Sequence, residues 1–96
     1  MVIHLGGDVG VLQKNIVAII DIDSPKPALA NTKFIANARS QGKLIEVSQD
    51  APKSCIIITL KNDVLVYLSP ITSRTLLHRV SSGQEMSSMQ NYLEKG

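Results

Sequence analysis

Aromatic side chains are scarce in this sequence: tryptophan is absent, and the aromatic residues are Phe34, Tyr67 and Tyr92. Apolar residues nevertheless make up 44% of the chain, which is typical of a folded domain. At 96 residues the chain is long enough for one domain with a modest core. That core must therefore be built mainly from isoleucine, leucine and valine.

Cysteine is equally rare, because Cys55 is the single one in the chain. This excludes an internal disulfide framework and favours a reducing compartment. Cys55 lies in an apolar run, so we expect a small core residue. No apolar run approaches the roughly 18 residues of a membrane span, and the opening MVIHLGG does not have the features of a signal peptide. We therefore expect no membrane contact and a cytoplasmic protein.

Motifs for metal binding and catalysis are also missing. His4 and His78 lie far apart, and no Cys/His spacing fits a zinc site. No serine occupies a G-x-S-x-G motif, and the early glycines do not form a G-x-G-x-x-G phosphate loop. Asp21 and Asp23 could bind a cation together, although a role in capping the next helix is favoured. We therefore predict no metal, no cofactor and no enzymatic activity.

Charge is unevenly distributed, although the net charge is only +2. Residues 1–23 contain one base and three acids, and residues 81–96 contain one base and two acids. Residues 24–80 contain three acids and eight bases, which are Lys26, Lys33, Arg39, Lys43, Lys53, Lys61, Arg74 and Arg79. A basic segment of this kind is compatible with nucleic-acid binding, and an ordinary solvated surface is the alternative.

Hydrophobic periodicity predicts six strands and two helices. The strands are expected at residues 2–5, 9–13, 15–22, 43–48, 54–60 and 64–69, and the helices at 28–41 and from 69 onward. The run at 54–60 is continuously apolar, so it should be buried on both faces. The order β-β-β-α-β-β-β-α indicates an α+β fold: a small, mostly antiparallel sheet or partial barrel with two short helices.

Short polar residues predict where these elements begin. Asp23 or Ser24 is expected to cap the first helix, and Ser69 the second helix with Pro70 at its first position. The sequence KND at 61–63 predicts a tight hairpin turn, since Asn and Asp tolerate positive φ.

Residues 1–80 are expected to form a single domain. Residues 81–96 are polar, with a weak spacing of Met86, Met89 and Leu93. We interpret them as a C-terminal tail, either briefly helical or disordered, that folding does not require.

Four stretches together resemble a known family: VIHLG, IVAIIDI, APKSCIIIT and VYLSPITSRTLLHR. In this order they resemble the Rem family of bacterial regulators of extracellular-matrix (biofilm) genes, and the RemB branch more than the RemA branch. The resemblance covers roughly residues 1–80. It implies a LytTR-like fold, transcription regulation by binding double-stranded DNA, and a ring-forming homo-oligomer with DNA around a basic outer surface.

The resemblance also implies which residues would contact DNA. The RemA branch carries adjacent arginines in the loop before the central strand, whereas here Ala51 and Pro52 occupy those places and leave Lys53 as the base. Another family arginine is replaced by Asn15, beside Lys14. The DNA-binding candidates are therefore Lys53, Lys14 and Asn15, with ordinary solvent-facing side chains as the alternative. Because lysine lacks the bidentate fork of arginine, an oligomeric module that binds a protein partner stays open as a second function.

Overall fold

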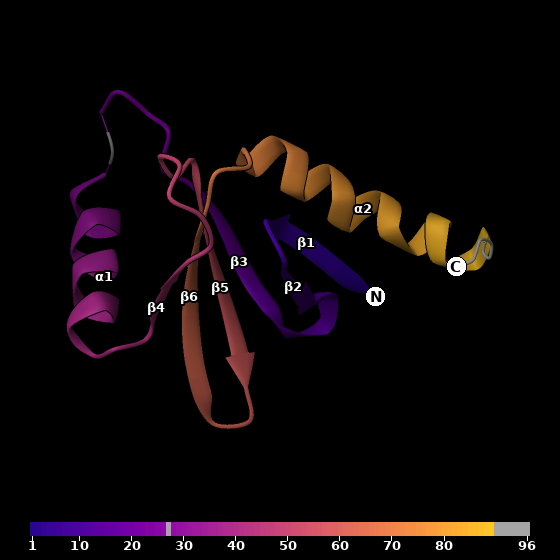
Figure 1. Ribbon diagram of the computed structural model, residues 1–96, viewed down its shortest axis with the longest axis horizontal. Helices are drawn as coiled ribbons and strands as arrows, with labels where there is room; N and C mark the ends of the chain where they lie inside the picture. The colour runs from indigo at the N-terminus through magenta and orange to yellow at the C-terminus, as the bar shows by residue number, and fades with distance from the viewer. Residues whose placement is uncertain (27, 90–96) are drawn as a thin grey trace.

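The computed structural model describes residues 1–26 and 28–89, which form two β-sheets and two α-helices (Figure 1). The elements are β1 (Val2–Gly6), β2 (Val9–Leu12), the 3-10 turn η1 (Gln13–Asn15), β3 (Ile16–Asp21), α1 (Leu29–Ser40), β4 (Leu44–Glu46), β5 (Ser54–Leu60), β6 (Asp63–Ser69) and α2 (Ser73–Met89). The predicted α+β class and the order of strands and helices are confirmed.

The larger sheet has the strand order β3-β5-β6-β4, and β1 and β2 form a separate antiparallel hairpin. Strand β5 is antiparallel to both of its neighbours, whereas β4 is parallel to β6. The sheets are therefore mostly antiparallel, as predicted. Across the described residues the larger sheet stays open, and no barrel closes.

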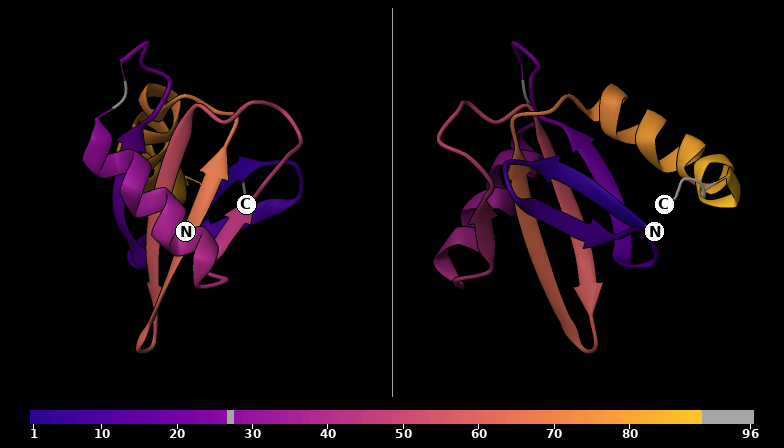
Figure 2. Two further views of the ribbon diagram at one scale, coloured as in Figure 1. Left: turned by 90° about the vertical axis from the view of Figure 1, so that its left-hand side faces the viewer. Right: turned by 45° about the vertical axis from the view of Figure 1, so that its right-hand side comes forward.

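The apolar run of β5 is explained by burial on both faces of the sheet. On one face, Ile56 packs in a core cluster with Leu5 of β1 and Leu76 of α2. On the other face, Cys55 packs in a second cluster with Ala38 of α1. Figure 2 shows α1 and the β1–β2 hairpin on opposite sides of the sheet. The prediction that Cys55 is a core residue is thus confirmed.

Helix α1 does not begin at either of the predicted caps. Its N-cap is Ala28, which makes no side-chain capping hydrogen bond. The hydroxyl of Ser24 accepts a hydrogen bond from the N–H of Lys26, and the N–H of Asp23 donates to the Asp21 carboxylate. These side chains form local turns upstream of the helix, which is the competing use of short polar residues.

Helix α2 also begins later than predicted, because Ser69 has another role. Ser69 ends β6, is fully buried, and donates its hydroxyl proton to the carbonyl oxygen of Leu5. The cap position belongs to Thr72, whose Oγ1 accepts a hydrogen bond of 3.2 Å from the N–H of Thr75. The prediction that Ser69 caps α2, with Pro70 at the first helical position, was therefore wrong.

Two further details concern the β5–β6 turn and the end of α2. In the β5–β6 turn the positive φ (56°) falls on Lys61, not on Asn62 or Asp63. Helix α2 continues past Val80 to Met89, so the first part of the polar C-terminal segment is helical, which is one of the two alternatives that the sequence left open. The remainder of that segment, which includes Leu93, lies outside the described residues.

Candidate nucleic-acid interface

Lys53 projects into solvent from a backbone that is held on both sides. Its N–H donates to the carbonyl oxygen of Ser69 (2.8 Å), and its carbonyl oxygen accepts from the N–H of Ile22 (3.1 Å). The side chain itself is exposed. Lys53 therefore presents a positive charge from a fixed position at the start of β5.

Carboxylates surround this end of the sheet. Asp21 lies opposite Ser54 in the strand register, Asp23 follows two residues later, and Asp50 precedes Lys53 in its own loop. All three acids are exposed. Because nearby opposite charges weaken the attraction for phosphate, Lys53 alone makes a modest anion site.

Lys14 and Asn15 lie at the other end of β3, in η1. Gln13 anchors this turn: its N–H donates to the Met1 carbonyl oxygen (2.9 Å) and its Nε2 donates to the Val80 carbonyl oxygen (3.3 Å). Lys14 is exposed and Asn15 is half-buried. Strand β3 separates this pair from the Lys53 end by about 20 Å, given about 3.3 Å per strand residue. The structure therefore does not bring the three sequence-predicted residues together.

Ion pairs neutralise part of the basic middle segment. Arg39 of α1 lies 3.4 Å from the Glu46 carboxylate, and Lys43 pairs with Asp63. The hydrogen bond from Lys43 is the main cause that lowers the pKa of Asp63, and the N–H of Val64 adds to it. The charge excess seen in the sequence is therefore smaller on the α1 side of the molecule than the count of bases indicates.

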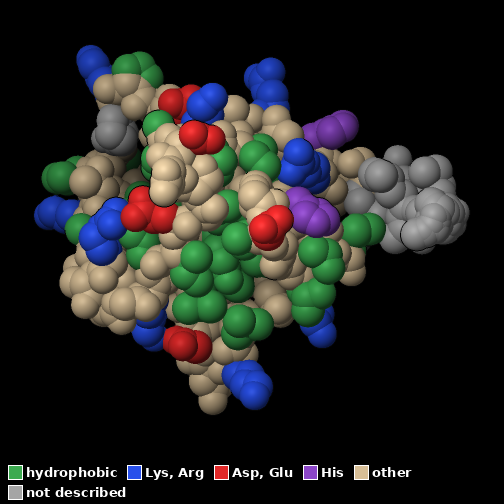
Figure 3. All heavy atoms as spheres, in the orientation of Figure 1, with side chains coloured by type: hydrophobic (Ala, Val, Ile, Leu, Met, Phe, Trp, Pro, Cys, Tyr) green, Lys and Arg blue, Asp and Glu red, His purple; other side chains and the backbone are tan. Residues whose placement is uncertain are grey.

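A second group of cations lies where α2 crosses the β1–β2 hairpin. The guanidinium of Arg79 donates a hydrogen bond of 2.9 Å to the carbonyl oxygen of His4, and both residues are exposed. Arg74 and His78 are exposed on the same helix. Figure 3 shows Lys/Arg and His side chains gathered over α2 and the hairpin. The sequence places Arg74 and His78 on one helix face, but the proximity of His4 comes only from the fold.

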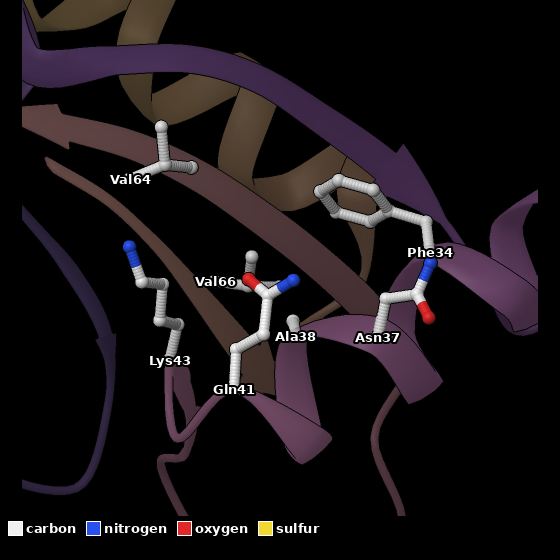
Figure 4. Close-up of a pocket in the computed structure, with 7 residues that line it drawn as sticks. All are labelled: Phe34, Asn37, Ala38, Gln41, Lys43, Val64 and Val66. Carbon is white, nitrogen blue, oxygen red and sulfur yellow. The ribbon is translucent and has the colours of Figure 1, made fainter.

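A hollow of about 410 Å³ lies between α1 and the sheet (Figure 4). Its lining is Phe34, Asn37, Ala38, Gln41, Lys43, Val64 and Val66. The floor is apolar, the rim carries two side-chain amides, and the ammonium of Lys43 is already paired with Asp63. The hollow thus offers mainly apolar contact.

The part of the chain that the structure describes contains neither a metal-binding cluster nor a membrane-spanning helix. Among residues 1–26 and 28–89, no group of three or more His, Cys, Asp or Glu side chains is placed to hold a metal ion. In the same part of the chain, neither helix is long and apolar enough to cross a membrane.

The fold and its surface define a small α+β domain with exposed cations at both ends of β3 and along α2. The chain belongs to the RemA-like family, described as extracellular matrix regulatory protein A-like, which matches residues 2–80. This match confirms the family resemblance inferred from the sequence, while the RemB branch stays a prediction. No curated protein matches the chain.

Proposed function

We propose that the protein is a DNA-associated regulator of extracellular-matrix (biofilm) genes that works as a ring-like homo-oligomer and is not an enzyme. Membership of the RemA-like family supports the regulatory role. The main support for DNA binding is the position of Lys53. Its backbone is held by hydrogen bonds to Ser69 and Ile22, while its side chain reaches solvent. A fixed cation of this kind suits phosphate, which positions a protein on DNA without reading its sequence.

The affinity of one subunit is expected to be low. A lysine binds phosphate as a point charge, without the bidentate geometry of arginine. A ring would repeat each contact once per subunit, and affinity would fall steeply as salt rises because counterions are released on binding.

The first test is a gel shift with a mixed-sequence duplex across a salt series. Lys53→Ala should weaken binding to all duplexes alike and make the salt slope less steep by about one per bound subunit. Its folding should change by less than about 0.5 kcal/mol, because the side chain is exposed. An unchanged affinity and salt slope would exclude Lys53 from the interface.

The reverse substitution tests the same surface by gain of binding. Ala51 and Pro52 are both exposed, so arginine can be accommodated at each position. Ala51→Arg combined with Pro52→Arg should raise DNA affinity well above that of the natural protein. If this variant is folded and oligomeric but gains no affinity, the loop does not face nucleic acid.

A second function, an oligomeric module for a protein partner, is favoured by exposed apolar surface. Val17 and Leu29 are 62% and 69% exposed, and the apolar hollow lies beside α1. Exposed apolar surface of this kind is typical of interaction sites. The same gel shift distinguishes the two functions, because a protein-binding module would not retard the duplex even at low salt.

A further inference from the structure

We propose that a cationic track for the phosphate backbone of duplex DNA runs along α2 and β1, from the Lys53 end of the sheet to Lys14. The track is made of four exposed side chains: His4, Arg74, His78 and Arg79. This inference rests on the proposed DNA binding and assigns its central contacts to α2, where the resemblance to the Rem family points to none.

One end of the track is set by hydrogen bonds between the sheet and the loop before α2. Lys53 donates its N–H to Ser69 (2.8 Å), and the buried hydroxyl of Ser54 donates to the Ile71 carbonyl oxygen (2.7 Å). These bonds hold the β6–α2 loop against the residue that follows Lys53. Arg74, in the first turn of α2, therefore lies close to the Lys53 end.

The next part of the track follows α2, where helix geometry places Arg74 and His78 on one face. Arg74 and His78 are four residues apart, so they share one face at a spacing of about 6 Å along the axis. Leu76, which is fully buried, marks the opposite face of the helix. Arg79 is turned toward β1, where its guanidinium reaches the His4 carbonyl oxygen at 2.9 Å.

Strand β1 completes the track toward η1. His4 is exposed and lies over Gly10, where an added Cβ would be 3.9 Å from the imidazole ring. From His4 the strand runs back to Met1, whose carbonyl oxygen accepts the N–H of Gln13 at 2.9 Å. Lys14 is the next residue and lies four residues along the chain from Gly10, the strand partner of His4, so its backbone lies about 13 Å from His4 at the usual rise of a strand.

The charge around the track is most positive along the first part of α2. Residues 64–84 contain no acid, so the stretch of α2 that carries Arg74, His78 and Arg79 has none; Glu85 follows six residues after Arg79 in the same helix. Asp8 lies in the β1–β2 turn, four residues after His4, and Asp21, Asp23 and Asp50 lie near Lys53. Figure 3 shows blue and purple side chains over α2 and the hairpin, with a red side chain directly beside the lower purple one.

The shape of the track fits an extended polyanion. A single small anion is bound by polar groups that converge in a concave site, whereas these side chains are spread along a helix and a strand. Over the roughly 20 Å between the two ends, a duplex presents about 12 phosphate charges. The four lysine and arginine side chains along the track and at its ends (Lys14, Lys53, Arg74 and Arg79) can therefore contact separate phosphates.

The test uses the full chain, a mixed-sequence duplex and a salt series between about 50 and 200 mM. Arg74→Gln combined with His78→Gln should weaken binding about tenfold and reduce the salt slope by one to two per bound subunit. Lys33→Gln is the matched control, because Lys33 is exposed on α1, on the other side of the molecule (Figure 1). The control should bind the duplex like the natural protein.

A variant that binds more tightly tests the proposal without the risk that weaker binding merely reflects unfolding. His78→Arg adds a permanent charge to the track and should raise affinity about threefold, with an unchanged circular-dichroism melt. If the natural protein binds the duplex but the track variants match Lys33→Gln, the track is wrong and the proposed function stands. If the natural protein binds no duplex at the lowest salt, both are wrong.

Discussion

At the scale of single residues, burial decides the chemistry of Cys55. Its side chain is 1% exposed, and burial raises the pKa of the thiol to about 11. In an unfolded chain a cysteine ionises near pH 8.5. Between these two values the unfolded state gains stability by losing a proton, and the folded state does not.

We therefore predict that Cys55 makes the protein less stable in alkali. The contribution of the protonated thiol should be fully present below about pH 8.5 and should fall by about 1.5–2 kcal/mol by pH 10. Urea unfolding at the two pH values measures this. Cys55→Ala serves as the control, since without the thiol its free energy of unfolding should not show this part of the decrease at alkaline pH. Equal losses in the two proteins would contradict the prediction.

A second residue-scale prediction concerns the buried hydroxyl of Ser69. It donates to the Leu5 carbonyl oxygen and accepts the N–H of Ile71, so its removal leaves two main-chain groups without this partner. Ser69→Ala should lower the free energy of unfolding by about 1–3 kcal/mol. Ser81→Ala should stay within about 0.5 kcal/mol, because that exposed hydroxyl bonds only within α2. Similar urea midpoints for the two variants would show that the hydrogen bonds of the Ser69 hydroxyl do not stabilise the fold.

The contrast between Cys55 and Ser69 shows what the sequence can predict for a residue. The burial of Cys55 follows from its place in an apolar run, which is local information. The burial of Ser69 depends on Leu5, which is 64 residues away in the chain. A serine before a proline is typical of a helix cap, so the local signal gave the wrong role.

At the scale of elements, strand positions were more predictable than helix ends. Within α2, Leu76 is fully buried and Val80 is half-buried, whereas Leu77 is 53% exposed. The reason is that α2 contacts the sheets with one narrow face, toward β1 and β3. Its extension to Met89 has only the weak apolar spacing of Met86 and Met89, which does not by itself distinguish a helix from a disordered segment.

We predict that ending the chain after Val80 preserves folding. The shortened α2 keeps the buried Leu76 and the bond from Gln13 to Val80. The hydroxyls of Ser81 and Ser82 bond only to carbonyl oxygens of their own helix, so no tertiary hydrogen bond of theirs is lost. The truncated protein should therefore melt cooperatively, near the temperature of the full chain.

A shorter chain is the control for this experiment. Ending it after Thr75 also removes Leu76, so that protein should lose its cooperative melt. A large fall in melting temperature for the first truncation would show instead that residues beyond Val80 pack on the domain or on another subunit.

At the scale of the whole molecule, we predict self-association. Val17 lies on the edge strand β3 and is 62% exposed, and Leu29 and Leu77 are also more than half exposed. An unprotected strand edge with apolar side chains favours pairing with a second copy. Light scattering should give a multiple of 10.4 kDa at micromolar concentration, and Val17→Lys should lower that mass without unfolding the chain. A single species of monomer mass would contradict the prediction.

The surface of the whole molecule was the least predictable feature. The sequence located the basic segment and, through its family resemblance, Lys53, Lys14 and Asn15. It did not reveal the acids near Lys53, because Asp21 and Asp23 reach that end only through strand pairing. Nor did it reveal the contact of Arg79 with His4, which joins residues 75 positions apart.

The parallel pairing of β4 also has a consequence for the order of folding. Strands β5 and β6 are joined by a turn of two residues, so their hairpin closes with little loss of chain entropy. Strand β4 precedes both in the chain, yet its neighbour is β6, with Leu44 opposite Val66. It has no strand to pair with until β6 is in place. We therefore expect β4, with the segment that leads from it to Lys53, to be acquired late and to be among the first parts to open in the native state.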